Sequence, residues 1–322
     1  MDDVLGPGYE RHVLELGVDE EGPVIATVVR RSAPTSGRAV LMLPGLADYF
    51  FQTHVADRLA GQGWSVYGLD PRRYGRSLLP GQTPNFCRDL ADYYPELDAT
   101  AAMMAGDGIR EVLVWGHSTG GLIASAWIAD RRPPIARGLF LNSPLLQLPL
   151  PWILRGPALR ALRPLARRFP KAAAPHRPAT VFAEATHRRW NGEWDYDLRL
   201  KPPAGHPVTL GWLAAVERAH TRLRRGLSLP LPVFLGSAAR SLGRHDPPGS
   251  AARTDVVLDV EAMRRLGSTL GDHVTTAAFP GAMHDLTLSA PAVRAQVLRQ
   301  AIAWANAVVF PGSSCDRSCS RG

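Results

Sequence analysis

Short apolar runs alternate with stretches of helical length along most of this chain, and this alternation limits the possible folds more than any other feature. Within each run the apolar residues are consecutive, which is typical of strands that a parallel sheet buries on both faces. The runs are residues 39–43, 65–69, 112–115, 138–141, 232–235 and 274–279. The stretches with helical length and periodicity are residues 52–61, 88–105, 120–129, 260–270 and 291–308. This order predicts an α/β protein with a mostly parallel sheet flanked by helices.

The first thirty residues differ from this pattern. Residues 9–16 and 24–31 alternate between polar and apolar side chains, which is typical of two antiparallel strands. We expect Glu20-Glu21-Gly22-Pro23 to form the turn between them. Together with the apolar runs, these two segments predict a sheet of eight strands.

One long interval interrupts the alternation. Between residues 141 and 232 there are many prolines and no clear strand, and such an excursion is usually a lid or an inserted subdomain. We therefore expect a core over residues 1–142 and 228–310, with a cap insertion over 143–227 after the sixth strand. Residues 311–322 are expected to form a disordered tail.

Within the cap, two features of the sequence are informative. Leu159, Leu162, Leu165 and Phe169 fall on one helical face, but Pro164 should divide any such helix into short pieces. The apolar residues of segment 145–153 either line an entrance for acyl chains or pack the cap onto the core.

The charge of the chain is concentrated in part of this insertion. The net charge of the 322 residues is +8, and residues 143–183 contain seven basic residues and no acid. These are Arg155, Arg160, Arg163, Arg167, Arg168, Lys171 and Arg177. Because no nucleic-acid-binding module accompanies them, we expect no nucleic-acid partner. A weak contact with an anionic membrane surface is the partner that the charge suggests.

The composition also bears on the compartment. There is no basic segment followed by an apolar core at the start of the chain, and no apolar run of about 18 residues anywhere, so we expect a soluble, cytoplasmic protein. The cysteines, Cys87, Cys315 and Cys319, are too few and too badly spaced for a disulfide framework or a zinc site. The sequence leaves the oligomeric state open.

The motif with the most chemical content is Gly116-His117-Ser118-Thr119-Gly120-Gly121, a G-x-S-x-G pattern. A buried-strand run precedes it directly and a helical stretch follows it directly. On such a strand-to-helix turn a serine projects its hydroxyl above the sheet, where it can act as a nucleophile. The alternative is that Ser118 only caps the helix.

A serine nucleophile needs a base, and in this architecture the base follows the last strand at the carboxyl edge of the sheet. The last predicted strand is 274–279, and His284 lies in the loop that follows it. His284 is therefore the expected base. His117 lies on the serine turn itself, and the remaining histidines fall elsewhere in the chain.

The acid partner of the histidine is expected after strand 232–235, but no carboxylate follows that strand directly. The candidates further along are Asp246, Asp255 and Asp259. Asp259 suits the N-cap of the helix over 260–270, and Asp246, beside two prolines, suits a solvated turn. Asp255 is the expected acid.

Two backbone amides are expected to bind the oxyanion of the reaction. Gly45 permits a tight turn after the first parallel strand, which would aim the N–H of Leu46 into the site. The N–H of Thr119, the residue after the nucleophile, would be the second donor.

Together these segments resemble an α/β-hydrolase. The residues that carry the resemblance are Pro44-Gly45, Asp70-Pro71-Arg72-Arg73-Tyr74-Gly75-Arg76-Ser77, the serine motif and His284. The Asp-x-Arg-x-x-Gly-x-Ser segment and the insertion after Asn142-Ser143-Pro144 most resemble the monoacylglycerol lipase and lysophospholipase-like branch, of the serine aminopeptidase S33 type. Two positions depart from that branch: Pro44 replaces a histidine before the oxyanion glycine, and Ala239 stands where the acid often lies.

The resemblance implies the α/β-hydrolase fold and a serine hydrolase that cleaves carboxylic esters, either lipid-like or small, through an acyl-enzyme on Ser118. It implies no metal and no organic cofactor. The same fold acting on another bond, as in peptidases and C–C hydrolases, and a non-catalytic binding protein are the alternatives.

Overall fold

The computed structural model describes residues 3–33, 37–149, 157–174 and 180–311. Its centre is an eight-stranded sheet with the order β1-β2-β4-β3-β5-β6-β7-β8. The pairs β1–β2 and β2–β4 are antiparallel, and all the others are parallel. The strands are β1 (Tyr9–Asp19), β2 (Gly22–Arg31), β3 (Arg38–Leu43), β4 (Ser65–Asp70), β5 (Glu111–His117), β6 (Ala136–Asn142), β7 (Val233–Ala238) and β8 (Val274–Phe279). The predicted α/β-hydrolase architecture with eight mostly parallel strands is therefore confirmed.

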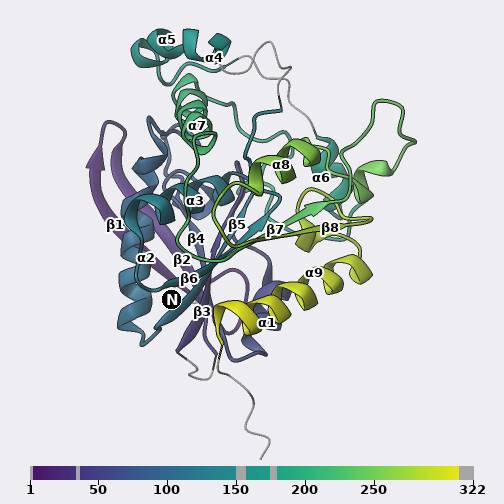
Figure 1. The fold of residues 1–322 in the computed structure, drawn as a ribbon. Coiled ribbons are helices and arrows are strands. Elements are labelled where there is room, and N and C mark those ends of the chain that lie inside the picture. Colours follow the sequence, from purple (N-terminus) through teal and green to yellow (C-terminus); the bar gives the residue numbers. More distant parts are fainter. Residues whose placement is uncertain (1–2, 34–36, 150–156, 175–179, 312–322) are drawn as a thin grey trace, which may run out of the picture.

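Helices cover both faces of this sheet (Figure 1). Helices α1 and α9 lie together on one side, and α2 and α3 lie on the other. The helices of the core are α1 (Thr53–Ala60), α2 (Tyr94–Gly106), α3 (Thr119–Arg131), α8 (Val260–Gly267) and α9 (Pro291–Trp304). Because the sheet is sandwiched in this way, the central strands are buried on both faces, which explains their continuous apolar runs.

The boundaries of the elements differ from the expected ones by a few residues. The expected turn of four residues at positions 20–23 is shorter, because Asp19 already pairs with Gly22 and β2 includes Pro23. Strand β5 runs on to His117, so that it ends directly at the serine. Ambiguity at element ends is usual, since end residues share the side-chain pattern of the element and differ only in hydrogen bonding.

The interval between β6 and β7 contains four helices among its described residues, namely α4 (Pro157–Ala161), α5 (Arg163–Arg168), α6 (Val181–Thr186) and α7 (Leu210–Leu223). The position of the insertion after the sixth strand is as expected, and the exact limits of 143–227 stay a prediction. The helix around Pro164 is divided into α4 and α5, as predicted. Residues 312–322 of the expected tail lie outside the described residues.

The apolar face expected on this pair of helices is buried only in part. Leu159 packs against the core, whereas Leu162, Leu165 and Phe169 are exposed. In Figure 1, α4 and α5 stand out from the body of the molecule beyond α7. In the apolar segment 145–153, Leu145 and Leu146 are buried in the main core. These two residues therefore pack the cap onto the core, which was one of the two roles expected of the segment. Residues 150–153 of that segment lie outside the described residues.

No helix in the described ranges is long and apolar enough to cross a membrane.

Candidate active site

The serine of the G-x-S-x-G motif lies at the junction of β5 and α3. Ser118 has a φ of 49° and a ψ of −115°. A positive φ is uncommon for a residue with a Cβ, and such strain persists only where the surrounding structure enforces it. The backbone N–H of Ser118 donates to the carbonyl of Asn142 at the end of β6 (3.0 Å), and its carbonyl accepts from Leu145 (2.9 Å). These bonds hold the strained residue in place.

The glycines of the motif allow helix α3 to approach the sheet closely. A Cβ on Gly116 would lie 2.5 Å from Gly121 Cα, and a Cβ on Gly120 would lie 2.4 Å from the carbonyl oxygen of Pro44. Both contacts are shorter than van der Waals separations and involve backbone atoms. The glycines are therefore required by packing between the strand, the helix and the loop after β3.

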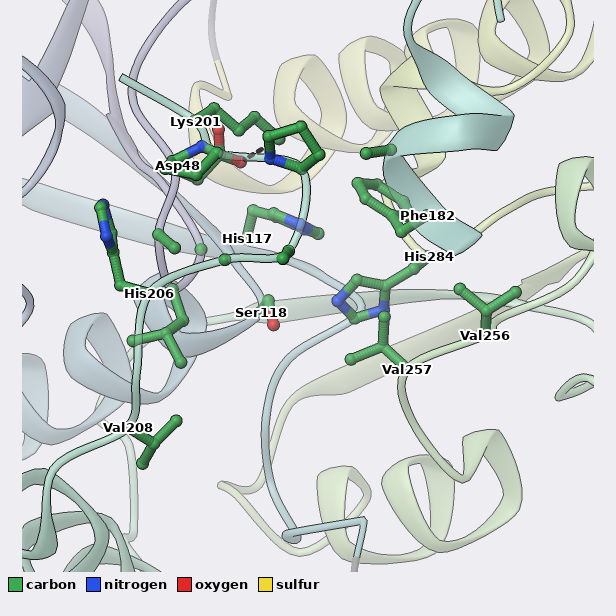
Figure 2. Close-up of a pocket in the computed structure, with 18 of the residues that line it drawn as sticks. Asp48, His117, Ser118, Phe182, Lys201, His206, Val208, Val256, Val257 and His284 are labelled. Carbon is green, nitrogen blue, oxygen red and sulfur yellow. Dashed lines mark ion pairs between the residues drawn. The ribbon is translucent and has the colours of Figure 1, made fainter. Parts of the chain in front are cut away.

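The hydroxyl of Ser118 does not cap the helix. Ser118 occupies the N-cap position of α3, but its side chain makes no capping hydrogen bond. Instead Ser118 lines a pocket at the carboxyl edge of the sheet, together with His284. Figure 2 shows the two side chains turned into this pocket from different elements. The alternative of a purely structural cap does not describe this serine.

His284 lies in the loop after β8 and is almost completely buried. Its Nδ1 is 2.9 Å from Asp255 Oδ2. Among the described residues its Nε2 has no hydrogen-bond partner, so that this nitrogen remains available on the pocket side. His117 is arranged differently, because its Nδ1 donates to the carbonyl of Asn142 (3.1 Å) and burial lowers its pKa.

Asp255 lies beside the histidine because the segment after β7 folds back, so that Asp255 pairs with a residue close to the end of that strand. Ser241 and Asp255 form an isolated parallel bridge, in which the N–H of Leu242 donates to the carbonyl of Asp255 (2.7 Å). The carboxylate Oδ1 accepts the N–H groups of Val257 and Leu258, both at 2.8 Å. Burial raises the pKa of Asp255, but the charge of His284 and these hydrogen bonds outweigh it, so that the pKa lies below its ordinary value.

The other two candidate acids lie elsewhere. Asp246 is half-buried and pairs with Arg240. Asp259 is the N-cap of α8, where its side chain accepts the N–H groups of Glu261 and Ala262. The bridge at Ser241 therefore closes the local insertion that separates Asp255 from the strand.

The loop after β3 passes directly beside the serine. A Cβ on Gly45 would lie 3.0 Å from His117 Cδ2 and 3.3 Å from Ser118 Cβ. The left-handed residue of this loop is Ala47, with a φ of 53°, so that Gly45 is required for close approach and not for the turn expected of it. The N–H groups of Leu46 and Thr119 donate to no acceptor in the described part of the chain.

The pocket beside Ser118 has a volume of about 370 Å³. Most of its lining is apolar and includes Pro149, Phe182, Val208, Val256 and Val257. Figure 2 shows Phe182, from the cap, next to His284, and the centroids of the two rings are 6.0 Å apart. The polar lining residues besides Ser118 and the histidines are Asp48, Tyr196 and Lys201.

Two pairs of polar residues in or beside this site were not found from the sequence. Asn142 Nδ2 donates to Asp285 Oδ1 (2.7 Å) directly behind the serine turn and the histidine loop. Lys201 Nζ is 2.7 Å from Asp48 Oδ2. One signal could have indicated the second pair, since Lys171 and Lys201 are the only lysines among 37 basic residues.

The expected basic stretch is neutralised in part by acids from other segments. Glu217 of α7 pairs with Arg163 (2.6 Å), and Glu21 pairs with Lys171 (2.9 Å). Arg155 and Arg177 lie outside the described residues. In the ranges that the structure describes, no group of histidine, cysteine or acidic residues could hold a metal ion.

Several solved α/β structures resemble this fold. A soluble variant of monoglyceride lipase from Saccharomyces cerevisiae, in complex with a substrate analogue, matches with a TM-score of 0.62 at 14% identity, covering 92% of this chain and 95% of that chain. Monoacylglycerol lipase from Paleococcus ferrophilus matches with a TM-score of 0.58 at 20% identity, covering 92% and 98%. A thermophilic esterase from Thermogutta terrifontis matches with a TM-score of 0.58 at 15% identity, covering 91% and 98%.

A family model supplies the more specific comparison. The model described as serine aminopeptidase, S33 matches residues 35–240, which include the loop after β3, the serine turn and the whole of the expected cap. This is more than half of the chain. The strained serine and the loop beside it thus lie within the residues that match one hydrolase family, and the chain belongs to the serine aminopeptidase S33 family of α/β-hydrolases.

Proposed function

We propose that the protein is a serine hydrolase that cleaves carboxylic esters through an acyl-enzyme on Ser118. The observation that carries this proposal is the strained Ser118, whose hydroxyl caps nothing, in the same pocket as a histidine hydrogen-bonded to a buried carboxylate. This combination contains the parts of an activated nucleophile: a serine, a histidine base in the same pocket and a third group that orients the base.

In the proposed reaction, Ser118 Oγ attacks the ester carbonyl while His284 Nε2 takes the hydroxyl proton. The Nδ1–H of His284 donates to Asp255, which fixes the tautomer and stabilises the imidazolium that forms. The protonated histidine then gives the proton to the leaving alcohol. Water repeats the sequence on the acyl-enzyme and releases the carboxylic acid.

The N–H groups of Leu46 and Thr119 are the proposed oxyanion donors. Two facts support this role: Gly45 brings the loop within contact distance of Ser118, and neither N–H has another acceptor in the described ranges. The N-terminus of α3, directly after the serine, adds its positive end to the same site. Removal of one such donor typically lowers kcat by about 10²- to 10³-fold.

The size and lining of the pocket suggest the class of substrate. A volume of about 370 Å³ lies at the small end of the range for ligand pockets, which is about 300–1,000 Å³. The apolar lining favours an acyl chain over a charged group. We therefore expect short and medium acyl esters to be better substrates than long-chain ones.

A series of p-nitrophenyl esters of increasing chain length, together with labelling by a fluorophosphonate, tests the proposal. The wild-type protein should label once, on Ser118, and should turn over the esters with an optimum at short or medium chains. Ser118→Ala should abolish both. Ser125→Ala is the matched control, because Ser125 lies in the same helix and donates to the carbonyl of Gly121 (2.7 Å) away from the pocket.

The same experiment separates the alternatives. Labelling with turnover of aminoacyl anilides and none of esters would assign a peptidase. Labelling with no turnover of either would favour a C–C hydrolase or another bond. Absence of labelling would contradict the serine assignment and leave a non-catalytic binding protein.

A further inference from the structure

The loop that carries the Leu46 amide contains a strained residue. Ala47 has a φ of 53°, which places a residue with a Cβ in the left-handed region. A residue in this region keeps its conformation only when its surroundings hold it there. The loop cannot relax toward the serine turn, because Gly45 already lies in contact with His117 and Ser118.

The next residue in the chain connects this loop to the cap. Asp48 Oδ2 accepts a hydrogen bond from Lys201 Nζ at 2.7 Å, and the two side chains are only 3% and 9% exposed. Asp48 Oδ1 accepts the N–H of Tyr49 (2.8 Å). Lys201 belongs to the segment between α6 and α7, so that this ion pair joins the cap to the residue directly after Ala47.

A second bond from the same cap segment reaches the same loop. The N–H of Asp197 donates to the hydroxyl of Tyr49 at 2.8 Å. Both contacts run from the segment between α6 and α7 to the two residues that follow Ala47. The cap therefore holds the loop at two adjacent positions.

The surroundings of Lys201 fix its ammonium group closely. The Nζ atom lies 4.9 Å from the ring centroid of Phe51, 5.2 Å from that of Tyr196 and 5.5 Å from that of Phe182. Three aromatic rings and one carboxylate thus stabilise a cation that has little access to water. Removal of the lysine would leave Asp48 as a buried, unpaired carboxylate, which is strongly unfavourable.

We propose that Lys201 is a positioning residue, which holds the strained loop through Asp48 so that the Leu46 N–H faces the developing oxyanion. This role rests on the proposed ester hydrolysis at Ser118. In this arrangement the oxyanion site is complete only when the cap segment is in place.

The test compares the two lysines of the chain. Lys201→Met should lower kcat for the best p-nitrophenyl ester by about 10- to 100-fold, because displacement of a catalytic group by about 1 Å costs about 10²-fold. KM should change less than about threefold, and the rate of fluorophosphonate labelling should fall in parallel with kcat. Lys171→Met is the matched control, since Lys171 pairs with Glu21 outside the pocket, and it should keep wild-type kinetics.

A second substitution distinguishes positioning from direct contact with the substrate. Glycine adopts a positive φ without strain, so that Ala47→Gly in the Lys201→Met background should recover about tenfold in kcat. If Lys201 binds the substrate, KM should rise and Ala47→Gly should recover nothing, which would overturn the proposal. The double variant Lys201→Met, Asp48→Asn avoids a buried unpaired carboxylate, and it should show the same loss of kcat if Lys201→Met alone does not fold.

Thermal unfolding of each variant completes the design. A variant that unfolds at lower temperature but keeps the kcat of the wild type would show a merely structural role and would also overturn the proposal. If the wild-type protein neither labels nor hydrolyses esters, the proposed function fails, and this role fails with it. If the wild type is active and Lys201→Met behaves as Lys171→Met does, only the role of Lys201 fails.

Discussion

Asn142 connects the serine turn to the histidine loop through Asp285. Its side-chain Nδ2 donates to Asp285 Oδ1 (2.7 Å), and its Oδ1 accepts the N–H of Leu286 (3.1 Å). Its backbone carbonyl accepts the N–H of Ser118 (3.0 Å). One residue at the end of β6 thus contacts both segments whose relative position the proposed reaction requires.

We predict that Asn142→Ala lowers both stability and activity. Loss of the donor leaves the buried Asp285 carboxylate without one of its partners, which should reduce the free energy of unfolding by about 3 kcal/mol. The turnover of esters should also fall in the fraction that remains folded, because the two loops lose their connection. Thr287→Val is the control: it removes a different donor to Asp285 (2.7 Å) without touching the serine turn, and it should reduce stability with a smaller effect on kcat. Urea unfolding and ester kinetics measure both effects.

Asp255→Asn should lower kcat by about 10⁴-fold, because an amide favours the wrong imidazole tautomer of His284. The fold should be retained, since the amide oxygen can still accept the N–H groups of Val257 and Leu258. Asp259→Asn provides the comparison, because asparagine caps a helix about as well as aspartate does. Equal losses of kcat in the two variants would contradict the assignment of Asp255.

Gly120→Ala should destabilise the protein through the loop after β3. The added Cβ would lie 2.4 Å from the carbonyl oxygen of Pro44 and 2.6 Å from that of Leu43. Overpacking of this kind typically costs about 1–3 kcal/mol. In Gly106→Ala, at the end of α2, the new Cβ meets no atom within 4 Å, so that stability should stay constant or rise by up to about 1 kcal/mol. Urea unfolding of the two variants tests whether close packing is the reason for the glycine.

Much of the fold could be predicted because buried parallel strands and covering helices leave different patterns in a sequence. The apolar run 112–115 and the helix directly after it led to Ser118 as the expected nucleophile. The last strand led to His284, in the loop after it, as the expected base. Both predictions depend on short-range order along the chain. The choice of Asp255 required an insertion to be bridged, and the bridge at Ser241 has no signature in the sequence that we recognised.

The contacts that were not predicted join residues far apart in the chain. Asp48 and Lys201 belong to no motif in the sequence, and only the fold brings them together in one pocket. The same holds for Asn142 and Asp285. Periodicity reports which side chains are buried, but it does not report which buried polar groups satisfy each other.

The exposed apolar residues of α4 and α5 lead to a prediction about membranes. Leu165 and Phe169 are exposed close to Arg167 and Arg168, on helices that stand out from the body of the molecule (Figure 1). We predict weak binding to phosphatidylserine vesicles at low salt, none to neutral vesicles, and loss of binding at about 0.5 M salt, where charges on the surface are screened. Phe169→Asp should reduce the binding in a sedimentation assay. Binding that is insensitive to salt would show that the arginines take no part.

The last prediction concerns stability at mildly acidic pH. His220 of α7 is buried, and its Nε2 donates to the carbonyl of Leu145 (2.8 Å). Burial lowers its pKa from 6.5 to about 4. Between these two values the unfolded chain binds a proton that the folded protein does not, so the free energy of unfolding falls as the pH falls.

From this shift, His220 alone should reduce the free energy of unfolding by about 2 kcal/mol between pH 7.5 and pH 5. His220→Gln keeps an N–H donor for Leu145 but does not titrate, so that its urea-unfolding curves should show a pH dependence smaller by this amount. Burial also lowers the pKa values of His54 and His117. Both residues are present in the wild type and in the variant, so that their contributions to the pH dependence cancel in the comparison. Equal pH dependence in the two proteins would mean that His220 becomes protonated in the folded state without cost.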